Sequence, residues 1–156
     1  MKVLAIDPGY DRIGLAVMEA QQGKEVLLFS TCFETDREAT LPKRMLALGQ
    51  EVETLLRTFQ PDAVALETLF FNKNIKTALS VAEARGVIIY LAQVAKCTLY
   101  EFSPQQIKVA VTGHGQSDKK AVISMVKRLI AQAPKAALDD EYDAIAVGIT
   151  CLAHYR

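Results

Sequence analysis

The sequence predicts a single α/β domain with a five-stranded mixed sheet flanked by helices. Apolar runs at residues 3–6 and 62–66 have the pattern of strands covered on both faces. Residues 12–19 and 25–33 are mostly apolar and add two strands before any helical period begins. A length of 156 residues suits one domain with a substantial core, so we expect the domain to span residues 1–156.

The first strands end at turn residues. The run at 3–6 stops at Asp7, which is followed by Pro8 and Gly9. The strands at 12–19 and 25–33 are separated by a short polar turn. We therefore expect an antiparallel meander of three strands.

A helix follows over residues 41–59, with Thr40 as its cap. Its apolar positions recur at steps of three and four residues; they are Leu41, Met45, Leu48, Val52, Leu55 and Phe59. Pro61 ends this helix, and the strand at 62–66 then runs directly into Glu67. An acidic residue thus follows a buried strand for the second time.

Helical spacing continues from residue 73 to 95, and a strand is expected at 98–102. Ser103 and Gln106 form the pattern of a capping box, and Gly113 closes the helix that they begin. We expect Ser117 to cap the next helix. Its predicted apolar face holds Val122, Met125, Val126 and Leu129. A last helix starts between residues 139 and 143 and continues through Ile145, Ile149 and Leu152.

Composition excludes several classes of protein. Hydrophobic residues make up 51% and charged residues 23%, which is ordinary for a globular domain. The apolar run at 87–95 is far shorter than the roughly 20 residues of a membrane span, so no membrane partner is expected. Neither a signal peptide nor paired cysteines are seen. Cys32, Cys97 and Cys151 are expected to be reduced thiols, and the location to be cytoplasmic.

Charge is distributed unevenly although the net charge is zero. Residues 70–135 hold 10 basic and 3 acidic side chains, whereas residues 1–69 hold 7 and 11. A basic middle segment is either a solvated face or a surface for a polyanion, and charge counting does not choose between them.

Four acidic residues are candidate metal ligands: Asp7, Glu67, Asp140 and Asp143. The spacing of Asp140 and Asp143 places both on one face of a helix. Each acid alone has a structural interpretation, since Asp and Glu are common at turns and helix starts. Glu67 is the strongest candidate, because a charge that continues a buried strand is costly unless it is paired or bound to a cation.

Four carboxylates gathered in one cleft would need counter-charge. Two of them about 4 Å apart repel by roughly 4 kcal/mol at an effective dielectric of 20. Oxygen-only ligands favour Mg²⁺ or Mn²⁺, and two such ions suit in-line phosphoryl transfer. The pattern therefore predicts a metal centre suited to phosphoryl transfer.

Six motifs in order resemble the RuvC family of Holliday junction resolvases, which have a ribonuclease-H-like fold. They are Ile6–Gly9, Glu67–Asn74, Ala84–Gly86, Gln106–Lys108, Thr112–Gly115 with Lys119, and Asp140–Ala146. The resemblance implies a homodimeric endonuclease that nicks four-way DNA junctions in two strands with Mg²⁺ or Mn²⁺. It also implies a junction-binding protein and a branch-migration motor as partners.

The resemblance also implies roles for individual residues. Asp7, Glu67, Asp140 and Asp143 match the family's metal-binding acids, while Lys108 and Lys119 match basic residues near the scissile phosphate. The implied DNA-binding residues are Phe70, Lys73, Arg85 and Lys120. Phe70 would stack on an unpaired base, a contact worth about 1–3 kcal/mol. Without the resemblance, Phe70 could equally be a core residue and Lys108 a solvated one.

Ile13, where the family commonly has Thr, and Ser117, where it has Ala, are departures from the pattern. The first also fits the related YqgF-type nucleases, which would act on RNA. Two further alternatives are a non-catalytic junction-binding protein and one lobe of a sugar-kinase or actin-like ATPase, for which Asp7–Gly9 and Gly14 resemble a phosphate turn.

Overall fold

The structure is a computed structural model that describes residues 1–68 and 75–155. Five strands form its sheet: β1 (Lys2–Asp7), β2 (Arg12–Gln21), β3 (Lys24–Glu34), β4 (Ala63–Glu67) and β5 (Thr98–Phe102). The helices are α1 (Leu41–Phe59), α2 (Ile75–Val94), α3 (Pro104–Thr112), α4 (Lys119–Leu129) and α5 (Asp139–His154). This is the element order that the sequence predicts.

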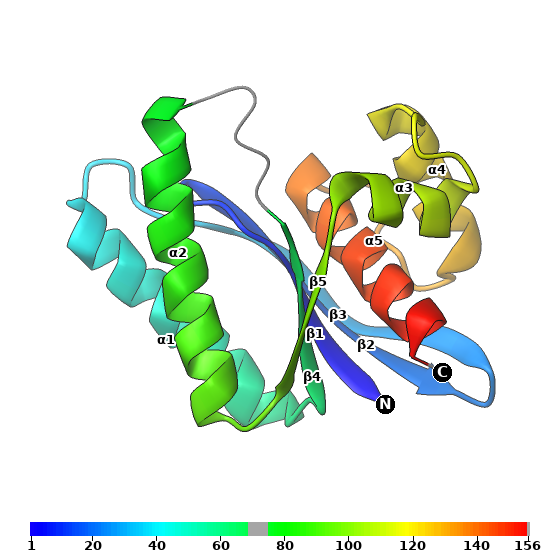
Figure 1. The fold of residues 1–156 in the computed structure, drawn as a ribbon, viewed down its shortest axis with the longest axis horizontal. Helices are drawn as coiled ribbons and strands as arrows, with labels where there is room; N and C mark the ends of the chain where they lie inside the picture. The colour runs from blue at the N-terminus through cyan, green and yellow to red at the C-terminus, as the bar shows by residue number, and fades with distance from the viewer. Residues whose placement is uncertain (69–74, 156) are drawn as a thin grey trace.

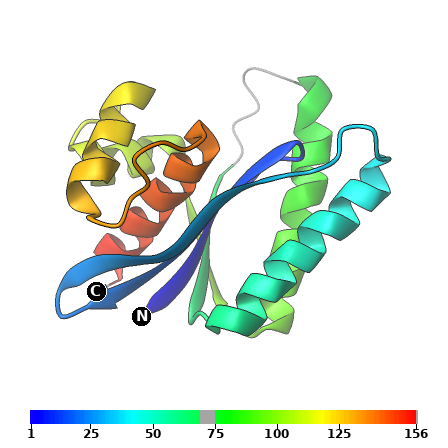
Figure 2. The ribbon, with the colours of Figure 1, turned by 180° about the vertical axis from the view of Figure 1, so that it is seen from behind.

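The strands lie in the order β3-β2-β1-β4-β5. β1, β2 and β3 pair antiparallel as a meander, while β1, β4 and β5 run parallel. Helices α1 and α2 cover one face of the sheet, and α3, α4 and α5 cover the other (Figures 1 and 2). The prediction of a five-stranded mixed sheet between helices is confirmed.

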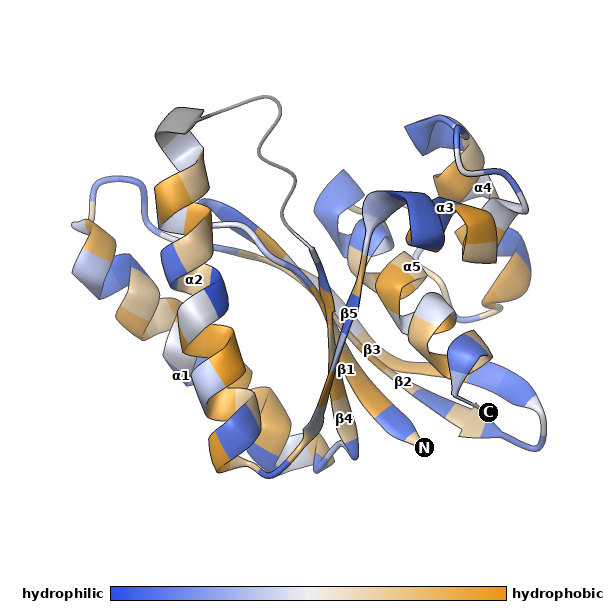
Figure 3. Cartoon of the chain, viewed as in Figure 1, coloured by the Kyte–Doolittle hydropathy of each residue, from blue (hydrophilic) through white to orange (hydrophobic). Residues whose placement is uncertain are grey.

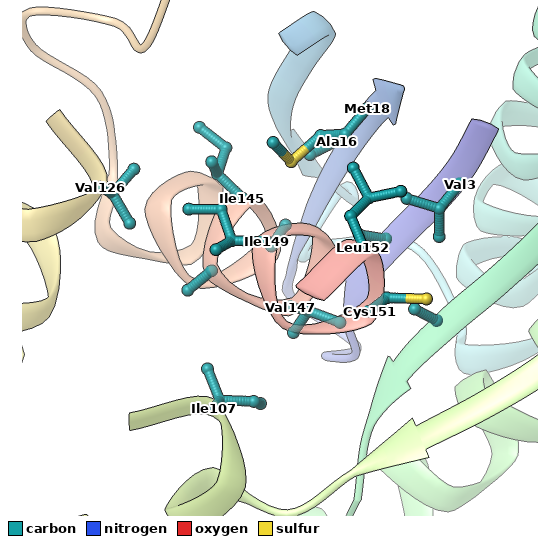
Figure 4. Close-up of a cluster of buried hydrophobic side chains, with 14 of the residues drawn as sticks. Val3, Ala16, Met18, Ile107, Val126, Ile145, Val147, Ile149, Cys151 and Leu152 are labelled. Atoms are coloured by element: carbon teal, nitrogen blue, oxygen red, sulfur yellow. The ribbon is translucent and has the colours of Figure 1, made fainter. Parts of the chain in front are cut away.

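Alternating side chains of β1 build two separate cores. Leu4 and Ile6 face α1 and α2, whereas Val3 and Ala5 face α5. All four side chains have no exposed area. Figure 4 shows the second core gathered around α5. The hydrophilic first turn of α5 projects beyond this core, at the end of the sheet where β1, β4 and β5 finish (Figure 3).

One helix cap differs from the prediction, and the start of α5 agrees with it. Asp118, not Ser117, caps α4, because its carboxylate accepts a hydrogen bond of 2.8 Å from the backbone of Ala121. The Ser117 hydroxyl instead lies 2.7 Å from that of Thr112 and ties the loop to the end of α3. α5 begins after Leu138, which offers no side-chain cap, so Asp139 and the acids after it lie in the first turn. The Ser103–Gln106 capping box is confirmed.

Helix α2 is more apolar along its length than the short run at 87–95 indicated. By length and composition alone, Thr77–Val94 is long and apolar enough to cross a membrane, a test that core helices of globular proteins also pass. The helix packs beside α1, and its Arg85 forms an ion pair with Glu101 of β5. Large apolar side chains nevertheless remain exposed on this layer, among them Leu46, Leu79 and Tyr90.

Candidate active site

Asp7 and Glu67 end two neighbouring parallel strands. Ile6 of β1 is in register with Leu66 of β4, so the acid that follows each of them reaches the same edge of the sheet. Burial raises the pKa of Asp7 well above its ordinary value, and the charge of Glu67 raises it further. Burial also raises the pKa of Glu67, so the two neighbouring carboxyl groups both hold a proton more readily than they would in water.

The first turn of α5 brings the other two acids to this edge. The negative charges of Asp143 and Asp140 both raise the pKa of Asp7, which places all four carboxylates in one electrostatic group. Gly14, the partner of Asp7 across the β1–β2 ladder, makes the approach possible. A Cβ atom at Gly14 would lie 1.8 Å from the carbonyl oxygen of Asp140. The sequence prediction that remote acids gather at one end of the sheet therefore agrees with the structure.

Two basic side chains balance part of this charge. Lys119 Nζ lies 2.8 Å from Oδ2 of Asp143 and 3.5 Å from Oδ2 of Asp139. Arg12 Nε lies 3.3 Å from Oδ2 of Asp140. Burial raises the pKa of Asp143, and the contact with Lys119 opposes that rise. Asp140 and Asp143 are thus each paired with a basic side chain of the protein.

A pocket of about 230 Å³ opens between β4, α3, α4 and α5. Glu67 and Asp143 line it together with Lys108 and Lys119. The positive charges of the two lysines lower the pKa of Glu67, although burial, the larger effect, raises it. Carboxylates that can bind cations and lysines that can bind an anion therefore share one pocket.

The donor set fits divalent cations. Its acids supply oxygen atoms only, the ligands that Mg²⁺ and Mn²⁺ prefer, and the raised pKa values of Asp7 and Asp143 reflect negative charge and burial that a cation would offset. Within residues 1–68 and 75–155, no three acidic, histidine or cysteine side chains stand together in a metal cage.

The predicted DNA-binding residues differ in their placement. Lys120 is exposed in the first turn of α4, and Lys108 is half-buried in the pocket. Arg85 is directed into the protein, where its guanidinium binds the Glu67 carbonyl and the Glu101 carboxylate. Phe70 and Lys73 lie outside the described residues.

Sequence reasoning assigned no role to Arg12 or Arg44, and both support the site. Arg44 is 8% exposed; its Nε donates to the Thr35 hydroxyl at 2.9 Å and its Nη2 to the Tyr10 carbonyl at 3.0 Å. It also forms an ion pair with Asp11, which holds the turn after Asp7 against α1. In the sequence, the sign of this role is that Arg44 is a charged residue on the apolar face of the predicted helix at 41–59.

Comparison with known proteins decides the family. The profile of the crossover junction endodeoxyribonuclease RuvC family matches residues 3–151. The chain belongs to the RuvC family. RuvC of Thermosipho melanesiensis is 44% identical over 153 residues, covering 98% of this chain and 97% of that protein. RuvC of Finegoldia magna is 41% identical over 151 residues, covering 96% and 91%.

Solved RuvC structures agree with the fold. Thermus thermophilus RuvC in complex with a Holliday junction substrate has a TM-score of 0.93 and 30% identity, with 100% of this chain and 95% of that chain covered. The yeast mitochondrial Holliday junction resolvase Ydc2 shares the fold at 18% identity, with a TM-score of 0.71 and coverage of 99% and 81%. Membership of the RuvC family favours neither the YqgF-type nor the sugar-kinase alternative.

Proposed function

We propose that this chain resolves four-way DNA junctions by metal-dependent hydrolysis of phosphodiesters at the carboxylate edge of the sheet. One observation carries the proposal: the ends of β1 and β4 and the first turn of α5 bring Asp7, Glu67, Asp140 and Asp143 to one edge of the sheet, next to a pocket lined by two lysines. RuvC relatives of nearly the same length, one of them bound to a Holliday junction, support DNA junctions as the substrate.

Asp7 and Glu67 on the strands, with Asp140 and Asp143 on α5, would hold two Mg²⁺ or Mn²⁺ ions. When bound, such ions activate a water molecule and stabilise the leaving oxygen. Burial raises the pKa of both Asp7 and Glu67, so any proton that they hold must leave before both can act as anionic ligands. Lys119 would leave Asp143 for the phosphate, because the pocket gives the ammonium group access to both.

The remaining basic and aromatic residues would hold the DNA. Lys108 lines the same pocket as Asp143, so its ammonium group would be available to the phosphate that is cleaved. Lys120 follows Lys119 in the first turn of α4 and is exposed to a neighbouring phosphate. Phe70 and Lys73 follow Glu67 in the sequence, and we assign them to the junction centre and its backbone on the family resemblance.

Paired nicks require two such sites, and we propose a homodimer formed through α1 and α2. A groove of about 730 Å³ runs between these helices, lined by Met45 and Gly49 of α1 and by Val87 and Leu91 of α2. Exposed apolar side chains stand on the same layer; their exposed fractions are 61% for Leu46, 74% for Leu79, 68% for Tyr90 and 61% for Val94. A surface with both projections and a groove can be self-complementary across a two-fold axis.

The family also implies a junction-binding protein and a branch-migration motor as partners, and a cytoplasmic location. Free cysteines, of which Cys97 and Cys151 are buried, agree with a reducing compartment.

The proposal is tested with an immobile four-way junction, a duplex and a single strand, each incubated with and without Mg²⁺. The wild-type protein should nick the junction in two strands only when Mg²⁺ is present. Asp7→Asn and Glu67→Gln should abolish nicking and retain junction binding in Ca²⁺ or EDTA, since they remove ligands without adding positive charge. Nicking by either variant at the wild-type rate would remove that residue from the mechanism.

A further inference from the structure

The peptide group between Glu67 and Thr68 is held at both of its polar ends. Its carbonyl oxygen, which belongs to Glu67, accepts a hydrogen bond from Nη1 of Arg85. Its N–H, which belongs to Thr68, donates to the carbonyl of Phe102 at 2.8 Å. The bond to Phe102 lies at the end of β4, where Glu67 is in register with Phe102 of β5. This peptide group is attached to the Cα atom of Glu67, so its orientation helps to set the direction of the Glu67 side chain.

Arg85 is itself held in place by an acid on a different element. Its Nη2 forms an ion pair with Glu101 of β5, the residue next to Phe102. The Arg85 side chain is only 11% exposed, whereas that of Glu101 is 44% exposed. A guanidinium group this buried needs acceptors, and it has one on each side: the Glu67 carbonyl and the Glu101 carboxylate. Arg85 thus bridges from α2 to the ends of β4 and β5.

We propose that Arg85 is a positioning residue for Glu67, oriented by Glu101, and that it acts on metal binding instead of contacting DNA. This inference rests on the proposed role of Glu67 as a metal ligand. Ligand groups hold a cation well only when neighbouring groups fix their orientation, and loss of such a neighbour typically weakens metal affinity by roughly 10–100-fold. Here the fixed group is the backbone of the ligand, not its carboxylate.

Simple electrostatics predicts effects of opposite sign for the two residues. Removing the positive charge of Arg85 should strengthen binding of a divalent cation and weaken binding of DNA. Removing the negative charge of Glu101 should weaken cation binding and strengthen DNA binding. A positioning role predicts weaker cation binding for each variant, with DNA binding unchanged. The double variant leaves the net charge as it was, so it isolates the positioning effect.

The experiment uses the full chain with Arg85→Gln, Glu101→Gln and the double variant. Arg57→Gln is the matched control, because Arg57 is exposed in the last turn of α1. Calorimetric titration with Mn²⁺ measures metal affinity, and four-way junction binding in EDTA at two salt concentrations measures DNA contacts. We expect Arg85→Gln and the double variant to weaken Mn²⁺ binding by a similar factor of roughly 10. Both variants should bind the junction with the affinity and the salt dependence of the wild type. Arg57→Gln should match the wild type in every assay.

The proposal is overturned if Arg85→Gln binds Mn²⁺ as well as or better than the wild type, or if it weakens junction binding and reduces the salt dependence. If Arg85→Gln does not fold, Glu101→Gln decides by its effect on the junction: tighter binding overturns the proposal, and unchanged binding with weaker Mn²⁺ affinity supports it. Glu67→Gln separates the two hypotheses. If Glu67→Gln binds Mn²⁺ with wild-type affinity, the role of Glu67 as a metal ligand is contradicted. If Glu67→Gln loses Mn²⁺ affinity and Arg85→Gln does not, only the positioning role of Arg85 is contradicted.

Discussion

Gly14 of β2 lies directly against the carbonyl oxygen of Asp140, at a position where an added Cβ atom would be 1.8 Å away. Gly14 is also the ladder partner of Asp7. The absence of one side chain therefore allows the acidic first turn of α5 to approach the strand end that carries the first acid. The contact joins parts of the chain that are more than a hundred residues apart.

Replacement of Gly14 by Ala should move the first turn of α5, because the obstacle is backbone and cannot rotate away. We expect a loss of stability of about 1–3 kcal/mol, as for other overpacked sites. A displacement of about 1 Å in Asp140 and Asp143 can lower the cleavage rate by roughly 100-fold. Urea unfolding and junction cleavage at saturating Mg²⁺ measure the two effects.

Gly148→Ala is the matched control on the same helix. A Cβ at Gly148 would lie 2.5 Å from Sδ of Met18, the far end of a flexible side chain in the core. This variant should lose stability to a similar or smaller extent and keep its cleavage rate, because Gly148 lies more than one helical turn beyond Asp143 in α5. Equal loss of cleavage in both variants would contradict a local effect of Gly14 on the acids.

The raised pKa of Asp7 predicts how the metal-free protein responds to pH. Because the folded state binds the proton more tightly than the unfolded state, the Asp7 contribution to stability is complete below its unfolded pKa of about 3.9. That contribution is lost as the pH rises through the raised folded pKa. In EDTA, Asp7→Asn should therefore be more stable than the wild type at pH 8, and the difference should shrink toward pH 4.

Thermal unfolding in EDTA across this pH range measures the difference between the two proteins. Addition of Mn²⁺ at pH 8 should raise the melting temperature of the wild type and have a smaller effect on Asp7→Asn. A stability difference that stays constant with pH would show that Asp7 is not the group that titrates.

Lys119 forms an ion pair with Asp143, so it would compete with a cation for that carboxylate. Lys119→Gln should bind Mn²⁺ more tightly, by an amount on the order of tenfold, because a positive charge leaves the site. The same variant should cleave the junction more slowly, since the proposed phosphate contact is lost. Lys120→Gln, a change of the same charge on the exposed neighbouring residue, should alter Mn²⁺ affinity much less. Weaker Mn²⁺ binding by Lys119→Gln would contradict the competition.

Much of the fold and the grouping of the acids could be predicted because both depend on local pattern. Apolar runs that end at Asp7 and Glu67 specify buried strands, and parallel neighbours finish at one edge of a sheet. The three-residue step from Asp140 to Asp143 specifies one helical face. These features need no knowledge of partners elsewhere in the chain.

The orientation of the basic residues could not be predicted, because it depends on partners distant in sequence. Arg85 lies within a motif of the resemblance and was expected to contact DNA, yet its guanidinium contacts Glu67 and Glu101. Arg12 pairs with Asp140 across more than a hundred residues. A local choice was also missed: Ser117 and Asp118 are both good caps, and the link from Ser117 to Thr112 leaves the cap to Asp118.

The exposed apolar layer of α1 and α2 predicts the effect of charge on the dimer. Leu46→Glu and Tyr90→Glu each place an unpaired charge where the proposed interface would exclude water, so both should produce monomers at micromolar concentration. Stability of the monomer should change little, because these side chains are 61% and 68% exposed in a single chain. Analytical ultracentrifugation measures the association state.

The dimer variants also test how the two nicks are coupled. A monomer keeps its own carboxylates, so it should still bind Mn²⁺ with wild-type affinity, but it presents one site to a junction with two-fold symmetry. We expect single nicks in place of paired nicks on a supercoiled plasmid that extrudes a cruciform, where paired nicks give linear product and single nicks give open circles. Val109→Glu is the control, because Val109 is 49% exposed on α3, on the opposite face of the sheet. Paired nicking by a variant that sediments as a monomer would place the interface, or the source of symmetry, elsewhere.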